Sequence, residues 1–407
     1  MIKAPRGTSD VLPSQQPLRE WLVAQGEATF RAYGYRRIST PTFEETELFA
    51  RTSGEGSDVV QKEMYTFADR AGRSLTLRPE ATAPVARAYV QHGLHRDPQP
   101  VKTFMVAPMY RYAAPQKGRY REFWQLNVEA MGSDDPAVDA EVIQLFAELL
   151  GRLELRGWSL QLNSIGDRAC RPGYVARLEA WLDEHDELLD DDARQKRRTS
   201  PLRVFDTKAA KVQQALAAAP KITDALCDDC RAHFDAVRAY LRAYGVPFEE
   251  VPTLVRGLDY YTRTAFEFVG EALGAQSALG GGGRYDYLIE EIGGPPTPGV
   301  GWAAGIERLL ISLEEEGRQG EPPRVDVFFV VEPDGDRIGM LRALAELRRR
   351  GLAADADYAG RSVKGQFTQA SRLGARVTVV VGADGARIRP RGGDERLVSL
   401  EEVPDAL

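Results

Sequence analysis

The sequence predicts an α+β fold in which an antiparallel sheet, a helical insertion and a small α/β domain follow one another along 407 residues. Residues 101–112 and 121–132 alternate apolar and polar side chains on either side of a Pro/Gly-containing loop, a pattern typical of an antiparallel hairpin. Residues 167–244 change to charged helical segments, after which strand-rich sequence resumes. Beyond residue 324, fully apolar strands alternate with helices, which predicts a mostly parallel sheet. This length also favours two or three domains over one.

The first region begins with a helix. Residues 14–33 carry apolar side chains at helical spacing and end at Gly34, a common helix stop. A short strand follows and closes at a proline. Residues 74–92 predict a strand that ends at Arg78 and leads into a helix with a proline near its start. After the hairpin, the pattern predicts an apolar helix over residues 137–153 and then a strand.

Behind the helical insertion, residues 254–269 favour a strand because they are rich in Val, Tyr, Thr and Phe. We expect this strand to pair with residues 276–293, and residues 299–317 to form a strand that runs into a helix. The Gly/Pro-rich stretch 317–324 predicts a domain boundary. The elements expected beyond it are strands over 325–331, 353–358 and 376–382 and helices over 338–351 and 364–375.

Composition excludes several classes of protein. With 43% apolar and 28% charged residues the chain resembles an ordinary globular protein. No apolar run approaches the roughly 20 residues of a membrane helix, and the first residues lack the apolar core of a signal peptide. A net charge of −7 argues against non-specific coating of nucleic acid. We therefore expect a cytoplasmic protein with no membrane partner, in which the basic clusters at 194–198, 348–350 and 387–391 are either solvated faces or local contacts.

The loop of the hairpin is basic. It places Arg111, Lys117, Arg119 and Arg121 close together, with Phe123 directly after them. A flexible loop of this kind can fold cations over phosphates while an aromatic ring stacks on a base. An exposed hairpin that stays soluble through its charge explains the pattern equally well.

Two glycine-rich stretches lie near the end of this region. Residues 280–283 are four successive glycines, which let a ligand or another backbone approach closely, or else form a floppy turn. Neither a P-loop nor a dinucleotide fingerprint fits their spacing. The glycines of 299–305 lead a strand into a helix whose first turn carries Glu307 and Arg308. An arginine there opposes the helix dipole, so it serves either an anion or a salt bridge to Glu307.

Residues 254–269 contain the most unusual cluster of side chains. Arg256, Asp259, Tyr260, Tyr261 and Arg263 lie inside an apolar frame. Burial of two cations, one anion and two phenols is costly unless each group finds a partner. Acidic residues next to other apolar strands raise the same question, because they could bind an ammonium or imidazole group or merely neutralise arginines; these are Glu80, Glu129 and Asp259.

The three cysteines are too few for a disulfide framework and suit a reducing compartment. Cys227 and Cys230, with His233 nearby, form part of a metal-ligand spacing, and Cys170 could be a third thiolate. A structural zinc site has four ligands, and no second Cys-x-x-Cys is present. Buried, inert thiols are the default interpretation, and no residue is predicted as a metal ligand.

Five sequence segments, taken in order, resemble one family. "GYRRISTPTFEE", "MYRYAAPQKGRYREFWQLNVE" and "GVGWAAGIERLL" are similar to motifs 1, 2 and 3 of class II aminoacyl-tRNA synthetases. "LVRGLDYYTRTAFEF" and "GGGGRYD" resemble the two histidine-specific signatures of histidyl-tRNA synthetases. The resemblance also includes "RGTSDVLP" and "TLRPEATAPVARA" and so spans nearly the whole chain.

The resemblance implies a class II catalytic domain with an antiparallel six-stranded sheet and flanking helices, a helical insertion and a C-terminal α/β anticodon-binding domain. The implied boundaries are 1–166 and 246–320 for the two parts of the catalytic domain, 167–245 for the insertion and 325–407 for the anticodon-binding domain. It further implies a homodimer, joined partly through motif 1. The implied reaction joins L-histidine to ATP as histidyl-adenylate and then transfers histidine to the 3′ end of tRNA(His), with Mg²⁺ as counterion of ATP.

The resemblance assigns ATP to the basic loop. Arg111 would hold the α-phosphate and Arg119 the outer phosphates, while Phe123 and Arg308 would enclose adenine. Arg256 would stand between the α-phosphate and the histidine carboxylate, where charge shifts during attack. Arg256, Arg111 and Arg308 are therefore the implied catalytic residues.

Histidine would bind on the other side. Glu80, Thr82 and Gln125 match positions that bind its amino group, and Glu129 and Tyr261 match positions that recognise its ring. Tyr260 and Tyr285 complete the implied substrate-binding set.

The chain also departs from the family pattern. Ala113 and Ala114 follow the Arg-aromatic pair of motif 2 where charged residues are usual, although Gln116 remains for the extra 5′ nucleotide of tRNA(His). The C-terminal domain ends early, so its last helix looks abbreviated, and its anticodon-contact candidates are the basic residues at 348–350 and 387–391.

Two rival functions stay open from the sequence. One is the synthetase-like regulatory subunit of ATP phosphoribosyltransferase, which typically lacks the anticodon domain and the signature around Arg256 that this chain has. The other is a synthetase-like protein that makes adenylate but does not charge tRNA.

Overall fold

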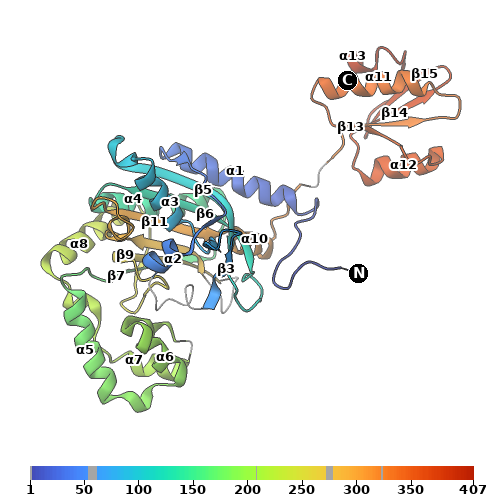
Figure 1. The fold of residues 1–407 in the computed structure, drawn as a ribbon. Coiled ribbons are helices and arrows are strands. Elements are labelled where there is room, and N and C mark those ends of the chain that lie inside the picture. The colour runs from blue at the N-terminus through green and yellow to red at the C-terminus, as the bar shows by residue number, and fades with distance from the viewer. Residues whose placement is uncertain (1, 54–61, 208, 272–277, 322–323) are drawn as a thin grey trace. The chain divides into compact units, whose positions relative to one another are not determined.

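The computed structural model describes residues 2–53, 62–207, 209–271, 278–321 and 324–407 (Figure 1). The chain divides into two compact units. The first comprises Met1–Val11 with Leu18–Gln319, and the second comprises Leu12–Pro17 with Gly320–Leu407. The boundary near residue 320 falls in the Gly/Pro-rich stretch at which the sequence predicts a linker, although residues 322–323 of that stretch lie outside the described part.

The first unit is built on an eight-stranded sheet. Its six inner strands are antiparallel, and each edge carries one two-residue strand that pairs in parallel. In spatial order the strands are β1 (Arg36–Arg37), β5 (Val101–Tyr110), β6 (Glu122–Met131), β11 (Gly299–Gly305), β10 (Ala278–Arg284), β9 (Thr262–Gly270), β7 (Trp158–Ser164) and β8 (Glu249–Glu250). The expected hairpin is β5–β6, with Tyr110 opposite Glu122 at the start of the loop.

One face of this sheet is covered by helices. These are α1 (Gln16–Ala32), α4 (Pro136–Arg152), α8 (Asp228–Ala243) and α10 (Ile306–Glu315). Their apolar stripes bury Leu22, Phe146 and Leu309, among others, against Phe104, Trp302 and further strand residues. Trp302 stacks on Phe146 with ring centroids 4.5 Å apart. The main core of the unit therefore lies on this side.

The opposite face forms a second, smaller apolar cluster. Side chains alternate along β5, so that Phe104 and Val106 enter the main core while Met105 and Met109 join this second cluster. The elements around it are α3 (Thr82–Gln91), α9 (Leu288–Glu291), α2 (Thr46–Ser53) and a three-stranded sheet of β2 (Phe43–Glu45), β4 (Ser74–Leu77) and β3 (Tyr65–Ala68). This face leaves room for a ligand.

The expected strand over residues 254–269 is only half correct. β9 begins at Thr262, whereas residues 254–261 form turns that precede it. Apolar and aromatic composition favours a strand, but these residues pair with no neighbouring strand and fold back over the sheet. Arg256, Tyr260 and Tyr261 are therefore loop residues.

The glycines at 280–283 lie within β10, so the alternative of a floppy turn is wrong. β10 lies between β9 and β11, and their backbones approach it closely. A Cβ atom built on Gly282 would lie 1.9 Å from the carbonyl oxygen of Gly301, and one on Gly283 would lie 2.4 Å from that of Thr264. Only glycine fits at these positions.

Helices fill residues 171–243, as the sequence predicts. They are α5 (Arg171–Glu184), α6 (Asp191–Thr199), α7 (Ala210–Leu216) and α8, with short 3₁₀ turns between them. The first three form a cluster, green in Figure 1, that projects from the sheet. They share a separate apolar core that includes Tyr174, Leu178 and Cys230.

The second unit contains a five-stranded sheet. Its strands, in spatial order, are β13 (Ala354–Ala356), β12 (Val327–Val331), β14 (Val377–Gly382), β15 (Gly385–Pro390) and β16 (Arg396–Val398). β12 pairs in parallel with β13 and β14, but β15 and β16 are antiparallel, so the expected mostly parallel sheet is in fact mixed. The helices are α11 (Arg337–Arg349), α12 (Val363–Arg372) and the four-residue α13 (Val403–Ala406).

In the described part of the chain, no helix combines the length and the apolar character needed to cross a membrane.

Candidate active site

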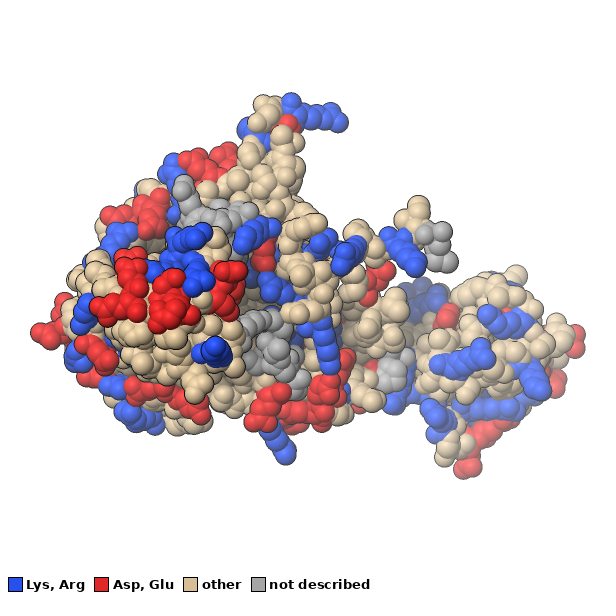
Figure 2. All heavy atoms as spheres, turned by 90° about the horizontal axis from the view of Figure 1, so that it is seen from below, with Lys and Arg blue, Asp and Glu red and all other residues tan. Residues whose placement is uncertain are grey.

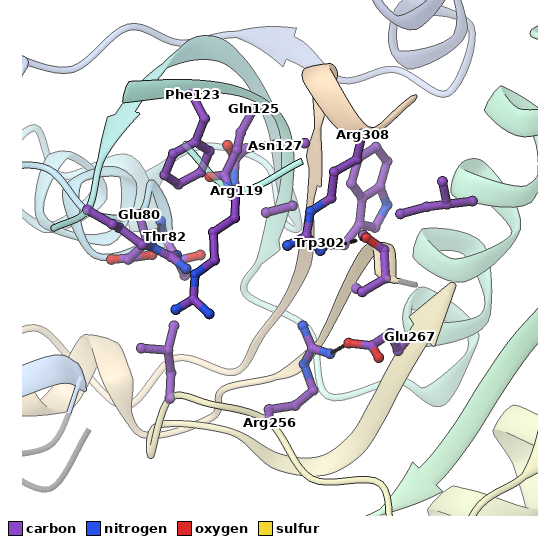
Figure 3. Close-up of a pocket in the computed structure, with 18 of the residues that line it drawn as sticks. Glu80, Thr82, Arg119, Phe123, Gln125, Asn127, Arg256, Glu267, Trp302 and Arg308 are labelled. Carbon is purple, nitrogen blue, oxygen red and sulfur yellow. Dashed lines mark hydrogen bonds and ion pairs between the residues drawn. The ribbon is translucent and has the colours of Figure 1, made fainter. Parts of the chain in front are cut away.

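A cavity of about 300 Å³ opens on the face of the large sheet that the main core leaves free (Figure 3). This is the low end of the size range of small-molecule sites. Its walls come from the residues before α3, from β6, β10 and β11, from the loop of the β5–β6 hairpin, from the turn before β9 and from the start of α10. Segments far apart in the sequence therefore meet at one place.

Ten of the twelve predicted site residues line this cavity: Glu80, Thr82, Arg111, Arg119, Phe123, Gln125, Arg256, Tyr260, Tyr261 and Arg308. The other two lie behind the wall: Glu129 accepts a hydrogen bond from Thr82 of the lining, and Tyr285 donates one to Glu129. Asp259 and Arg263, from the same unusual cluster, lie elsewhere. Asp259 lines a separate depression with Arg171, and Arg263 contacts Asp167.

One end of the cavity is acidic. Glu80 precedes α3 and accepts hydrogen bonds from the backbone N–H groups of Thr82, at 2.6 Å, and Ala83, at 2.9 Å. This arrangement ties a carboxylate to the start of a helix, where the dipole favours negative charge. Burial nevertheless raises the pKa of Glu80, because these hydrogen bonds only partly offset its loss of water.

Glu129 is the most perturbed acid at this end. It lies on β6 with 2% of its surface exposed. Burial raises its pKa to about 8, and the nearby Glu80 adds to the rise, while hydrogen bonds from Thr82 and Tyr285, both 2.6 Å, oppose it. At neutral pH this environment therefore favours the protonated form of Glu129, and a ligand bearing N–H donors would help to ionise it.

Tyrosines surround the acidic end. The rings of Tyr260 and Tyr261 lie 4.6 Å apart, and that of Tyr285 lies 6.0 Å from Tyr260. All three are buried in the second apolar cluster. Burial raises the pKa of each phenol, which keeps it as a neutral hydrogen-bonding group.

Two buried amides add acceptors on β6. In the described structure the Oε1 atom of Gln125 and the Oδ1 atom of Asn127 have no hydrogen-bond partner, although both are shielded from solvent. Both residues line the cavity. Such oxygens suit a ligand that donates hydrogen bonds, as an ammonium group does.

The other end of the cavity is rich in guanidinium groups. Arg111 donates from Nε to the carbonyl oxygen of Pro79, at 2.8 Å, and its guanidinium lies 5.4 Å from the ring centroid of Phe123. Burial lowers the pKa of Arg111, and the nearby Glu63 and Glu80 counter that effect. Arg119 forms a 2.6 Å ion pair with Glu63. Cations thus face into the cavity from the hairpin and its loop.

Arg256 reaches the cavity from the turn before β9. Its Nη1 atom lies 2.5 Å from Oε1 of Glu267, on β9, as the dashed line in Figure 3 marks. Burial lowers the pKa of Arg256, but Glu267 and Tyr261 more than offset this, so its charge is secured. Its buried Nε–H finds no acceptor among the described residues, which leaves one donor for a ligand.

Arg308 is held at the start of α10 by backbone oxygens. It donates from Nε to Gly118, at 2.9 Å, and from Nη1 to Ala278, at 2.7 Å. The alternative of a salt bridge to Glu307 is wrong, because Glu307 pairs with Arg19 at 3.1 Å and accepts the backbone N–H of Trp124 at 3.0 Å. Arg308 therefore faces the cavity beside Trp302 (Figure 3).

Sequence reasoning missed the carboxylates that fix the arginines. Glu63 and Glu267 both line the cavity and pair with Arg119 and Arg256. A signal for Glu267 was present, since it is the one charged residue between two core phenylalanines of an apolar strand. Glu63 gave none, because its partner is 56 residues away.

Comparison with known proteins identifies the family. The family model described as histidyl-tRNA synthetase matches residues 7–167 and 168–309. The chain belongs to the histidyl-tRNA synthetase family. A histidine–tRNA ligase of Moorella thermoacetica is 48% identical over 99% of this chain and 96% of its own length, and one of Desulforamulus reducens is 45% identical over 98% and 97%.

Solved structures agree with this family. The apo histidyl-tRNA synthetase of S. aureus superimposes with a TM-score of 0.83 at 38% identity and covers 100% of this chain and 99% of its own. A protein from Bacillus halodurans, described as an ATP phosphoribosyltransferase regulatory subunit/histidyl-tRNA synthetase, gives 0.65 at 25% identity over 91% of this chain and 96% of its own. The predicted histidyl-tRNA synthetase resemblance and class II fold are confirmed, and the regulatory-subunit alternative is not favoured.

Proposed function

We propose that the chain is a histidine–tRNA ligase, which activates L-histidine with ATP and transfers the histidyl group to the 3′ end of tRNA(His). The observation that supports this function best is the polarity of the cavity. An acidic, tyrosine-lined end suits the amino group and ring of histidine, and a guanidinium-rich end suits the phosphates of ATP. Arg256 lines the same cavity, paired with Glu267 (Figure 3), and would contact both substrates.

ATP would bind at the basic end. We assign the α-phosphate to Arg111 and the outer phosphates to Arg119, because both side chains enter the cavity from the hairpin. Phe123 and Arg308 would enclose adenine between a ring and a guanidinium plane. The carbonyl contacts of Arg308 with Gly118 and Ala278 support this role, since they hold its plane still.

Histidine would bind at the acidic end. Its ammonium group would meet Glu80, Thr82 and Gln125, because the amide oxygen of Gln125, which has no partner among the described residues, offers an acceptor. Its ring N–H would meet Glu129, which Thr82 and Tyr285 hold in place. Tyr260 and Tyr261 would complete the wall around the ring.

Activation needs little proton transfer, because the attacking carboxylate is already an anion. One carboxylate oxygen bonds to the α-phosphorus of ATP, and the bond from that phosphorus to the bridging oxygen breaks, so that pyrophosphate leaves with the electron pair. Arg256, fixed by Glu267, would hold both anions in line and stabilise the charge between them. A terminal ribose hydroxyl of the tRNA then attacks the acyl carbon and displaces AMP.

Mg²⁺ would enter with ATP, since magnesium is usually held by one or two carboxylates together with substrate phosphates. Glu63 and Glu267 are carboxylates in the cavity lining and so fit this donor set. The ion would neutralise charge on the phosphates. Independently of the ion, Glu63 and Glu267 hold Arg119 and Arg256 in place.

We also propose a homodimer, formed partly through motif 1. Its support is a pair of aromatic rings on the three-stranded sheet: Phe43, within motif 1, and Phe67 are 48% and 44% exposed, with centroids 6.3 Å apart. Exposed aromatic pairs of this kind are common at protein interfaces. Sedimentation of the Phe43→Ser variant and of the parent chain at micromolar concentration measures whether the substitution weakens the dimer.

For tRNA we assign the anticodon to the second unit, residues 325–407, and the acceptor end to the site in the first. On the face in Figure 2, basic and acidic residues are interspersed, which agrees with recognition by placement rather than by one basic surface. The basic candidates are largely paired: Arg387 contacts Glu332 and Arg350 contacts Glu346. As an enzyme of translation, the protein would act in the cytoplasm.

Two assays test this function. Histidine-dependent exchange of pyrophosphate into ATP reports adenylate formation, and charging of a tRNA(His) transcript reports transfer. We expect both. Exchange without charging would favour an adenylate-forming relative, and the absence of both would favour a regulatory binding protein.

A further inference from the structure

The base of the helical insertion holds a cluster of thiols that the proposed reaction does not use. All three cysteines of the chain and one acid meet there, and their ligand atoms lie within 4.8 Å of one another. Asp167 and Cys170 follow β7, while Cys227 and Cys230 stand at the start of α8. His233, which the sequence suggested as a ligand, lies apart from them and contacts Asp139 at 3.7 Å.

The distances match those of a tetrahedral metal site. Two thiolates on one zinc ion, each at about 2.3 Å and at tetrahedral angles, lie about 3.8 Å apart. The Sγ atoms of Cys170 and Cys230 are 3.9 Å apart. A thiolate and a carboxylate oxygen on the same ion lie about 3.5 Å apart, and Cys170 Sγ to Asp167 Oδ1 is 3.7 Å.

The surroundings of the cluster support a buried ion. Three of the four side chains are buried. Cys227 is partly exposed, so an ion can reach the cluster from solvent. The backbone N–H of Asp167 points at the sulfur of Cys170 at 3.4 Å, and that of Ala169 donates to Oδ1 of Asp167. Arg263 lies 3.4 Å from Oδ2 of Asp167. Backbone donors and a nearby cation are the outer contacts that stabilise anionic metal ligands.

We propose that Asp167, Cys170, Cys227 and Cys230 bind one zinc ion with three thiolates and one carboxylate oxygen. Soft thiolate ligands in a four-coordinate set select zinc over magnesium or calcium. The site has no open position for a substrate, so its role is structural. Asp167 is the ligand that the cysteine spacing alone did not supply.

A metal here would fasten the two ends of the insertion. Cys170 and Cys230 are separated by 60 positions along the chain, so the ion closes a long loop. The fastened segment also touches the candidate active site, because Arg171 donates to the carbonyl oxygens of Ile165, at 3.0 Å, and Tyr261, at 2.6 Å. Metal binding would therefore steady the backbone beneath Tyr261.

The full chain, purified without chelator and with a phosphine reductant, tests the proposal by elemental analysis for zinc. The chelated protein is then titrated anaerobically with Co²⁺ and, in competition, Zn²⁺. We expect one zinc per chain, and with cobalt a thiolate charge-transfer band and strong visible bands of a tetrahedral ion. Chelation should also lower the melting temperature.

Variants locate the ion. Cys227→Ser, at the most accessible ligand, and Asp167→Asn should each bind cobalt more weakly and change its spectrum, whereas Asp228→Asn, an exposed acid in the same helical turn, should bind as the parent does. Circular dichroism checks folding, and if the serine variant misfolds, Asp167→Asn decides. Three reactive thiols with no bound zinc and no tetrahedral cobalt spectrum would overturn the proposal. So would a disulfide that persists as the native state, or equal binding by all variants.

Discussion

Arg256 and Glu267 form an ion pair on the wall of the cavity, 11 positions apart in sequence. In the proposed mechanism the pair is a positioning device, because Glu267 holds a guanidinium whose Nε–H has no acceptor among the described residues. An arginine suits this task better than a lysine, since its planar fork can contact both anions. The carboxylate fixes that fork before substrate arrives.

We expect Arg256→Ala to slow histidyl-adenylate formation by about 100- to 1,000-fold, which corresponds to about 2.7–4 kcal/mol for a donor that acts on the transition state. Binding of ATP should change far less. Single-turnover adenylate formation measures the first effect, and equilibrium binding of ATP measures the second. Arg152→Ala, an exposed arginine of α4, is the control. Near-normal adenylation by the alanine variant would remove Arg256 from the mechanism.

Glu129 leads to a prediction about pH. Because its folded pKa, about 8, exceeds its ordinary value of 4.5, the folded chain holds more protons than the unfolded chain between these limits. The free energy of unfolding should therefore fall as the pH rises through this window, by at most about 1.4 kcal/mol per pH unit from this group. Glu129→Gln should lose that part of the slope.

Urea unfolding of the ligand-free protein and of Glu129→Gln, at several pH values between 5 and 8, gives the comparison. Added histidine should flatten the curve of the parent, because its N–H donors favour the ionised acid. If the two proteins show parallel pH dependence, Glu129 does not titrate in this range.

At the scale of elements, the glycines of β10 leave space for a side chain that lies against this strand. Gly281 pairs with Glu267, and a Cβ atom there would lie 2.9 Å from Nη1 of Arg256 and 2.7 Å from the carbonyl oxygen of Phe266. Because Gly281 has no side chain, the guanidinium of Arg256 can occupy the space beside it. A side chain on β10 would displace either Arg256 or the neighbouring strand.

We expect Gly281→Ala to reduce adenylate formation by at least tenfold and to lower the melting temperature, because backbone cannot yield as a flexible side chain can. Gly151→Ala is the matched control. It lies near the end of α4 with nothing within 4 Å of the new atom, so it should leave activity intact and keep or slightly raise stability. Equal activity of the two variants would show that β10 tolerates a side chain.

Local sequence patterns predicted most elements of the first unit, because the strands of its hairpin and the helix of residues 137–153 bury one regular face each. They failed at residues 254–261, where tyrosines and an arginine serve a cavity rather than a strand. They also missed the antiparallel pairing of β15 and β16, since apolar periodicity does not encode strand direction.

For the whole molecule, all cavity residues belong to the first unit, and the second unit has apolar clusters of its own. We expect deletion of residues 320–407 to leave histidine-dependent pyrophosphate exchange largely intact and to reduce charging of tRNA(His) by at least tenfold. Sedimentation checks that the shortened chain keeps its assembly. Loss of exchange in a folded, correctly assembled fragment would contradict the separation of activation from tRNA recognition.

The ordered motifs predicted the family, and ten of the site residues that they imply line one cavity in the structure. The motifs did not predict which residues pair with these site residues through tertiary contacts. Strands and a helix separate Glu63 from Arg119, and the helices of the insertion separate Asp167 from Cys227 and Cys230, so only the tertiary structure brings these residues together. Ion pairs and sets of metal ligands depend on tertiary contacts rather than on the spacing of residues along the sequence.

The large sheet ends in two-residue strands at both edges: exposed Arg36 and Arg37 on one side, exposed Glu249 and Glu250 on the other. Long, apolar edges invite a second sheet to continue the hydrogen-bonded ladder, which is how many β-rich proteins aggregate. Here each border is too short and too strongly hydrated to act as such a template. A sheet of eight strands can therefore end at both margins without presenting a long unpaired ladder on either side.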